Sequence, residues 1–113
     1  MKLLAAERAV IAPAKIRDYL LSASHPVGRF KAPFFASLGY TSANWQRLEE
    51  DLLSLAVSGD AELGKNSPYG QKYEVRGTLR GPSGRSAGVL TVWIILFGGK
   101  VPEFVTAFPG EMT

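Results

Sequence analysis

The chain has 113 residues, of which 46% are hydrophobic and 20% charged; it carries a formal charge of +3 and has a pI of about 9.4. This length suits one domain spanning residues 1–113, and the basic balance mildly favours anionic partners. With no cysteine and one histidine, disulfides and thiolate metal sites are excluded and a zinc site is disfavoured. No apolar run is long enough to cross a bilayer and no signal peptide is recognisable, so we expect a cytoplasmic protein without membrane partners, metal or cofactor.

The first half of the chain, residues 1–59, shows helical periodicity. Pro13 can open a first helix, and Pro33 can confine a second helix to its later part. Gly59 is suited to ending a third helix. We therefore predict helices over roughly 13–22, about 27–38, and from Thr41 or Ser42 to Gly59.

The second half, residues 60–113, changes to the period of two that is typical of strands. Predicted strands cover residues 69–80, 85–97 and 103–108, with turns at GPSG (81–84) and Gly98–Gly99. Helices followed by antiparallel strands predict an α+β fold. Two to three N-terminal helices should pack on one face of a roughly four-stranded antiparallel sheet.

The two faces of this sheet should differ in chemistry. An even-length turn at GPSG places Lys72 opposite Trp93, and the apolar face containing Leu90 and Val92 should then pack on the helices. The other face would be open and would carry Lys72, Glu74, Arg76, Thr78, Arg80, Thr91, Trp93 and Thr106. Such a face is either an ordinary solvated surface or a platform on which the bases of single-stranded RNA stack.

The stretch HPVGRFK (25–31) holds the only histidine, His25, together with Arg29 and Lys31. His25 can be purely structural, satisfied by backbone groups of a bend before a helix. Alternatively, it can act on phosphate, because metal-free RNA cleavage needs a proton-transfer group, a cation for the phosphorane and an acid for the leaving oxygen. His25, Lys31 or an arginine, and a threonine hydroxyl could share these tasks.

Several blocks of the sequence resemble a small uncharacterised bacterial domain family. The blocks are DYLL, HPVGRFKAPFF, LGY, GPSGR, TVWI and VTAFP, and they span nearly the whole chain. The layout of that family is similar to the barnase–EndoU–colicin–RelE superfold of metal-independent ribonucleases. Those proteins are often toxins with a neighbouring antitoxin or immunity protein.

The resemblance implies a toxin-type endoribonuclease that cleaves RNA by attack of the 2′-hydroxyl and is paired with a cognate antitoxin or immunity protein. The matched blocks of the resemblance give six site residues: His25, Arg29, Lys31, Thr91, Trp93 and Thr106. Three further basic residues, Lys72, Arg76 and Arg80, come from the predicted open face. We expect His25, Lys31, Thr91 and Thr106 to be catalytic and the others to bind RNA. Phe108 replaces the usual tyrosine of the last block, which leaves the role of that hydroxyl open here.

The single histidine and this missing tyrosine also allow a non-catalytic function. The alternative prediction is an RNA-binding module, or the neutralising partner of a two-protein system. A ribonuclease requires His25 or Lys31 to meet a threonine around one phosphate-sized cleft, and a binding module does not.

Overall fold

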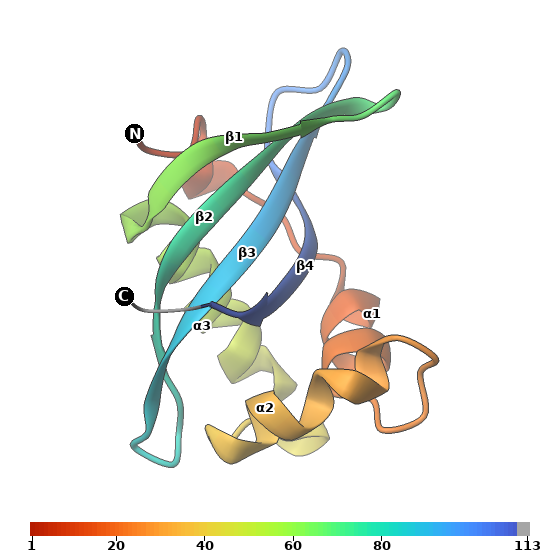
Figure 1. The fold of residues 1–113 in the computed structure, drawn as a ribbon, viewed down its shortest axis with the longest axis vertical. Coiled ribbons are helices and arrows are strands. Elements are labelled where there is room, and N and C mark those ends of the chain that lie inside the picture. The colour runs from red at the N-terminus through yellow and green to blue at the C-terminus, as the bar shows by residue number, and fades with distance from the viewer. Residues whose placement is uncertain (111–113) are drawn as a thin grey trace.

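A four-stranded antiparallel sheet forms one layer of the protein, and the computed structural model describes residues 1–110 (Figure 1). The strands are β1 (Asp60–Asn66), β2 (Gly70–Arg80), β3 (Ser86–Leu96) and β4 (Glu103–Pro109), and they neighbour one another in chain order. The helices precede the sheet in the chain. The predicted α+β fold class is therefore confirmed.

The helical half is more broken than its periodicity predicts. Its elements are η1 (Ala6–Arg8), α1 (Pro13–Lys15), the π-helical turn η2 (Ile16–Leu20), η3 (Gly28–Phe30), α2 (Ala32–Ser37), η4 (Ser42–Asn44) and α3 (Trp45–Ser58). Pro33 lies in the first turn of α2, where its missing N–H costs nothing, and this confines the helix as expected. Thr41 and Asn44 form a capping box that leads into α3.

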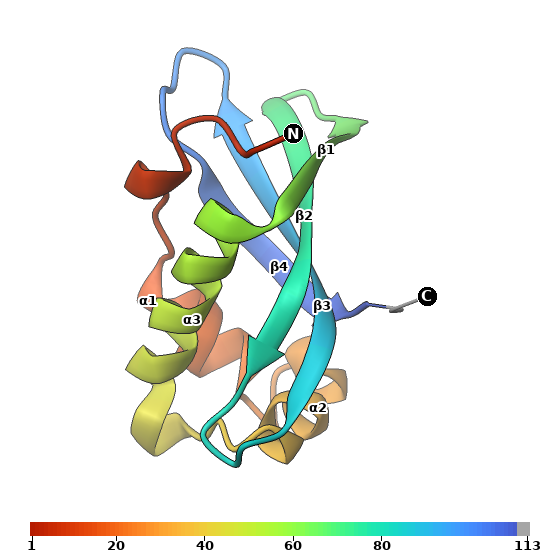
Figure 2. The ribbon, with the colours of Figure 1, turned by 90° about the vertical axis from the view of Figure 1, so that its left-hand side faces the viewer.

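Helix α3 covers one face of the sheet. Its buried residues Leu48, Leu52, Leu55 and Ala56 recur at helical spacing and pack in the core. In Figure 2, α1 and α3 lie on one side of the sheet and α2 lies at its lower end. Within residues 1–110, no helix has the length and apolar content needed to span a membrane.

The pairing of β2 with β3 exchanges the two faces of β3 relative to the prediction. Arg80 pairs with Ser86 and Lys72 pairs with Ile94, so five residues, 81–85, connect the strands instead of four. Gly84 has a positive φ of 87°, and its N–H donates to the carbonyl of Gly81. A left-handed glycine after a tight turn adds one residue to a hairpin connection, and one residue is enough to exchange the faces of a strand.

Thr91 and Trp93 consequently face the helices, and the prediction that they lie on the open face is wrong. Both side chains are 0% exposed. The Trp93 indole N–H donates to the Thr91 hydroxyl at 2.8 Å, and that hydroxyl donates to the Val75 carbonyl at 2.9 Å. The Trp93 ring also packs edge-on against Phe104, with the ring centroids 5.3 Å apart. Every polar atom of this pair is therefore satisfied inside the core.

The face of the sheet that turns away from α3 holds the alternate residues. Glu74, Val92 and Thr106 lie side by side across β2, β3 and β4, and Arg76 and Phe108 flank Leu90 in the same way. Thr106 thus lies on this outer face, as predicted, but with Val92 as its neighbour on β3 in place of Thr91 and Trp93. Phe108 lies on the same face, next to Leu90.

Candidate functional site

Three polar side chains from distant parts of the chain meet at the outer face near β4. The Lys31 ammonium donates to the Tyr19 Oη at 2.7 Å and to the Thr106 Oγ1 at 2.6 Å. The two hydroxyls are themselves hydrogen-bonded at 3.0 Å. All three residues are half-buried, so they form a fixed triangle that solvent or a ligand can still reach.

Local backbone features bring these residues together. Leu21 N–H bonds to the Ile16 carbonyl, which is the wider π-helical spacing, and such turns are frequent at functional sites. Gly28 is buried against this turn, where any side-chain carbon would overlap the carbonyl oxygen of Tyr19. The register of β4 slips between Phe104 and Thr106. This bulge re-aims the strand and leaves Thr106 facing outward.

Tyr19 is a phenol with a perturbed acidity. Partial burial raises its pKa, but the hydrogen bonds from Lys31 and Thr106, together with the charges of Lys31 and Lys15, outweigh that effect. The net result is that the pKa of Tyr19 lies below its ordinary value. The Lys31 and Lys15 ammonium groups lie 5.0 Å and 5.4 Å from the centre of its ring, so both cations also contact the ring face.

Lys31 has one ammonium proton left for a ligand. A lysine carries three N–H donors, and two of them are used by Tyr19 and Thr106. The same ammonium lies 5.6 Å from the centre of the Phe108 ring. Phe108, the position at which the resemblance implies a tyrosine, is therefore directly beside this cation. With phenylalanine there, the site depends on Tyr19 for its phenol.

His25 packs against the same phenol ring, edge-on, with the ring centroids 5.0 Å apart. Its Nδ1 accepts hydrogen bonds from the backbone N–H groups of Val27 and Gly28, each at 3.0 Å. Because the Nδ1 lone pair is used in this way, the hydrogen-bond network assigns the proton of the neutral ring to Nε2. In this arrangement His25 presents a donor to the site. It does not present the lone pair that a base needs.

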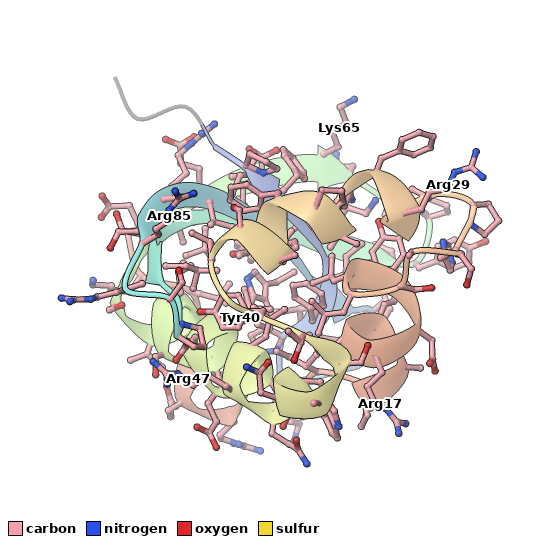
Figure 3. The ribbon with its side chains drawn as sticks, turned by 90° about the horizontal axis from the view of Figure 1, so that it is seen from below. Arg17, Arg29, Tyr40, Arg47, Lys65 and Arg85 are labelled. Carbon is pink, nitrogen blue, oxygen red and sulfur yellow. The ribbon has the colours of Figure 1, made fainter. Side chains whose placement is uncertain are left out.

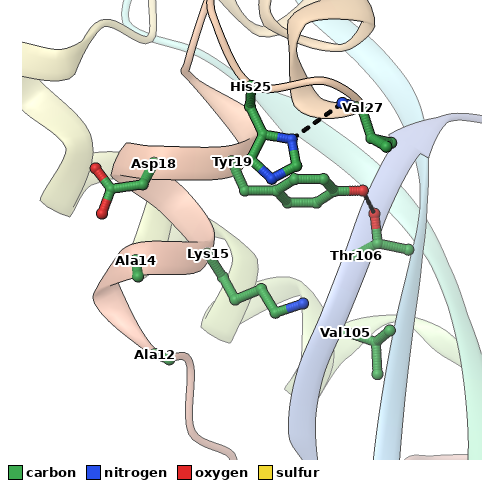
Figure 4. A pocket seen from close by; sticks show the side chains of 9 residues that line it. All are labelled: Ala12, Ala14, Lys15, Asp18, Tyr19, His25, Val27, Val105 and Thr106. Carbon is green, nitrogen blue, oxygen red and sulfur yellow. Dashed lines mark hydrogen bonds between the residues drawn. The ribbon is translucent and has the colours of Figure 1, made fainter.

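Two depressions adjoin Thr106. The first, about 590 Å³, is lined by residues of α1, η2, the 25–27 segment and β4 (Figure 4): Ala12, Ala14, Lys15, Asp18, Tyr19, His25, Val27, Val105 and Thr106. The second, about 210 Å³, lies over the strands and is lined by Gly64, Lys65, Lys72, Glu74, Val92, Val105 and Thr106. Val105 and Thr106 line both, so β4 forms the divide between them.

The predicted site residues separate into three groups. His25 and Thr106 line the first depression, Lys31 reaches its edge through the hydrogen bond to Thr106, and Lys72 lines the second. The three arginines are exposed and lie outside both depressions. Arg29 stacks on Phe30 at 4.8 Å, Arg76 lies on the outer face, and Arg80 lies beside a shallow hollow next to α3. Thr91 and Trp93, buried in the core, have no access to a substrate.

Seen from below in Figure 3, Arg29 and Lys65 project on the same side of the molecule, while Arg17 and Arg47 project on the opposite side. Arg47 is paired with Asp51 on α3, at 3.0 Å. Lys65, which lines the second depression, thus lies on the side of the molecule away from Arg17 and Arg47.

Tyr19 was missed by reasoning from the sequence. It shares a helical stripe with Ile16 and Leu20, which are fully buried, and this pattern indicates a core residue. Its hydroxyl partner Thr106 is 87 residues away, so no local spacing reveals the contact. The tyrosine of the DYLL block was the available signal. Within residues 1–110, no group of three histidine, aspartate or glutamate side chains is placed to hold a metal ion.

Comparison with known proteins gives a family and a fold. No curated protein matches the sequence. Among solved structures, the chain is similar to one in a contact-dependent growth inhibition toxin–immunity protein complex from Klebsiella pneumoniae 342. The TM-score is 0.70 at 17% identity, and the match covers 96% of this chain and 98% of that chain. The model of a domain of unknown function, DUF6883, matches residues 2–111. The chain therefore belongs to the DUF6883 domain family.

Proposed function

We propose that this domain is a metal-independent endoribonuclease and the toxin component of a bacterial toxin–antitoxin or toxin–immunity pair, acting on RNA in the cytoplasm. One observation carries the proposal: Tyr19, Thr106 and His25 line an open depression, and the Lys31 ammonium is hydrogen-bonded to the first two. This supplies a cation, a phenol of lowered pKa and hydrogen-bond donors around a space that a phosphate can enter.

The reaction follows from these groups. The phenolate of Tyr19 accepts the proton of the ribose 2′-hydroxyl while the 2′-oxygen attacks phosphorus. The remaining N–H of Lys31 stabilises the negative charge that develops on the phosphorane oxygens. The bond from phosphorus to the 5′-oxygen then breaks, and that oxygen takes a proton from solvent. The products are a 2′,3′-cyclic phosphate and a 5′-hydroxyl.

The neighbouring side chains hold the phosphate. The Nε2–H of His25 and the hydroxyl of Thr106 can each donate to a phosphate oxygen. Lys15 lines the same depression and adds positive charge. In this mechanism His25 binds and orients the phosphate, and Tyr19 takes over the proton transfer that the sequence assigned to His25.

The similar chain in the Klebsiella complex supports a place in such a two-protein system, because that structure is a toxin–immunity assembly. That complex contains both a toxin and an immunity protein, however. The two hydrogen bonds that occupy His25 Nδ1 also suit a purely structural histidine. The second candidate function is therefore a non-catalytic RNA-binding module, or the neutralising partner of such a pair.

Expression in a bacterium separates the candidates. The wild-type chain is expected to arrest growth on induction, and Lys31→Met is expected to abolish the arrest. The matched control is Lys100→Met, which removes the same charge from the exposed β3–β4 turn and should leave the arrest intact. Normal growth with the wild-type chain, at a verified level of folded protein, would favour the neutralising or binding role. Arrest by Lys31→Met equal to wild type would reject the proposed site.

A further inference from the structure

The second depression plays no part in the proposed chemistry, yet it adjoins the same threonine. All four strands contribute to its lining: Gly64 and Lys65 come from β1, Lys72 and Glu74 from β2, Val92 from β3, and Val105 and Thr106 from β4. At about 210 Å³ it is smaller than the pockets of about 300–1,000 Å³ that take drug-sized ligands. A single ring system with a phosphate at its rim is the size of ligand it suits.

Two strand irregularities shape this depression. The register of β1 slips between Leu63 and Asn66, so Gly64 and Lys65 fall outside the regular pairs. A side-chain carbon at Gly64 would come within 3.3 Å of the Lys72 carbonyl, which is tighter than ordinary contact. The Gln71 side-chain amide donates to the carbonyls of Gly64 at 3.3 Å and Lys72 at 2.8 Å. These features hold the β1 backbone at Gly64 against Lys72, and Lys65 and Lys72 both line the hollow.

The opposite side of the depression is apolar. Val105 occupies the bulge of β4, and Val92 lies next to it on β3. Flat aliphatic surfaces of this kind pack against the face of an aromatic ring. The depression thus combines two ammonium groups, an apolar wall and one carboxylate, Glu74.

The carboxylate of Glu74 lies next to another carboxylate and has no protein partner among the described residues. It pairs directly with Glu62 across β1 and β2, and like charges in that position destabilise a sheet. Arg47–Asp51 is the salt bridge found within residues 1–110, and Glu74 has no hydrogen-bond partner in that part of the chain. Glu74 is half-buried and lines the depression, and no buried side-chain oxygen in the described residues lacks a partner, so its carboxylate keeps contact with solvent. It can accept two hydrogen bonds from a ligand.

We propose that the second depression is a nucleotide subsite, in which Glu74 selects guanine next to the cleaved phosphate while Lys65 and Lys72 hold the neighbouring phosphate. This inference rests on the proposed function. A carboxylate only accepts hydrogen bonds, so it favours a base edge with two adjacent donors. Guanine offers N1–H and N2–H side by side. Adenine, cytosine and uracil each place a donor next to an acceptor, which the carboxylate repels.

Calorimetric titration with the four nucleoside 3′-monophosphates tests the subsite without requiring catalysis. The guanosine nucleotide is expected to bind about tenfold to a hundredfold more tightly than the others, the range for one bidentate contact. Glu74→Gln should remove this preference. Lys72→Met should weaken all four nucleotides by a similar factor, because it contacts phosphate.

Glu62→Gln is the matched control, since it removes the same like-charge pair and Glu62 does not line the depression. It should keep the guanine preference. Equal binding of all four nucleotides, no binding, or an equal loss in Glu62→Gln and Glu74→Gln would overturn the subsite. RNA cleavage without base preference would reject this inference alone. A guanine preference that depends on Glu74, in a chain that cleaves no RNA, would reject the proposed function alone.

Discussion

Replacing Tyr19 with phenylalanine removes one oxygen atom and leaves the ring that contacts His25, Lys15 and Lys31. The folded state loses the bonds of that oxygen to Lys31 and Thr106, while Lys31 keeps its 2.6 Å bond to Thr106. A hydrogen bond contributes about 0.5–1.5 kcal/mol net, and these half-exposed partners can rebind water. We therefore expect Tyr19→Phe to lower the free energy of unfolding by about 1 kcal/mol.

The expected effect on cleavage is much larger. Loss of a positioned proton-transfer group costs about 10²–10⁴ in rate. This corresponds to roughly 3–5 kcal/mol of transition-state stabilisation, which exceeds the loss of fold stability. Single-turnover cleavage of a fluorescent RNA and urea unfolding of the same preparation measure the two quantities. A folded Tyr19→Phe variant that cleaves within a factor of about three of wild type would refute the assignment of Tyr19 as the proton acceptor.

The lowered pKa of Tyr19 gives this comparison a pH dependence of known sign. The folded pKa lies below the unfolded value of about 10, so the phenolate stabilises the folded state at pH above the unfolded value. That contribution is lost as the pH falls through the folded pKa. The unfolding free energy of wild type minus that of Tyr19→Phe should therefore grow as the pH is raised toward about 10. A difference that stays constant or shrinks over that range would contradict the direction of the shift.

Three further substitutions probe the surroundings of the site. Trp93→Ala should lower the free energy of unfolding by about 3–5 kcal/mol in urea, because the ring is fully buried and its removal leaves a cavity; a change below about 1 kcal/mol would place the indole outside the core. Gly28→Ala should displace the η2 turn and reduce RNA cleavage together with thermal stability, because the added methyl group overlaps the Tyr19 carbonyl; unchanged values of both would show that the turn adapts freely. His25→Asn should be more stable than His25→Ala by about 1 kcal/mol, since the amide oxygen can accept the two backbone N–H bonds; equal stability would mean that the cap contributes little.

The order of elements was predictable because hydrophobic periodicity changes from helical to alternating at Gly59, where α3 ends and β1 begins. Which residues of the sheet face the helices was not predictable. Strand β3 is apolar on both sides, with Val89 and Trp93 facing the core and Leu90 and Val92 facing outward. Its alternation therefore carries no mark of which side is buried. The side of β3 that faces the core depends on the left-handed conformation of Gly84 in the β2–β3 turn. The sequence does not specify that conformation.

The candidate site was predictable where residues lie in one short motif, and not where contacts are long-range. HPVGRFK placed His25 and Lys31 near each other, and the resemblance added Thr106. The role of Tyr19 depends on a π-helical turn and on a contact across 87 residues. The tautomer of His25 depends on how the 25–28 backbone folds back on the ring. Neither feature follows from periodicity or composition.

Product analysis with a chelator tests the central claim most directly. Purified wild-type chain, incubated with a defined single-stranded RNA in EDTA, should yield fragments that end in a 2′,3′-cyclic phosphate and begin with a 5′-hydroxyl. Lys31→Met should reduce the rate by about 10²-fold or more, and Lys100→Met should match wild type. Intact RNA at every protein concentration, cleavage that stops when the chelator is added, or equal cleavage by Lys31→Met would contradict a metal-independent ribonuclease centred on Lys31.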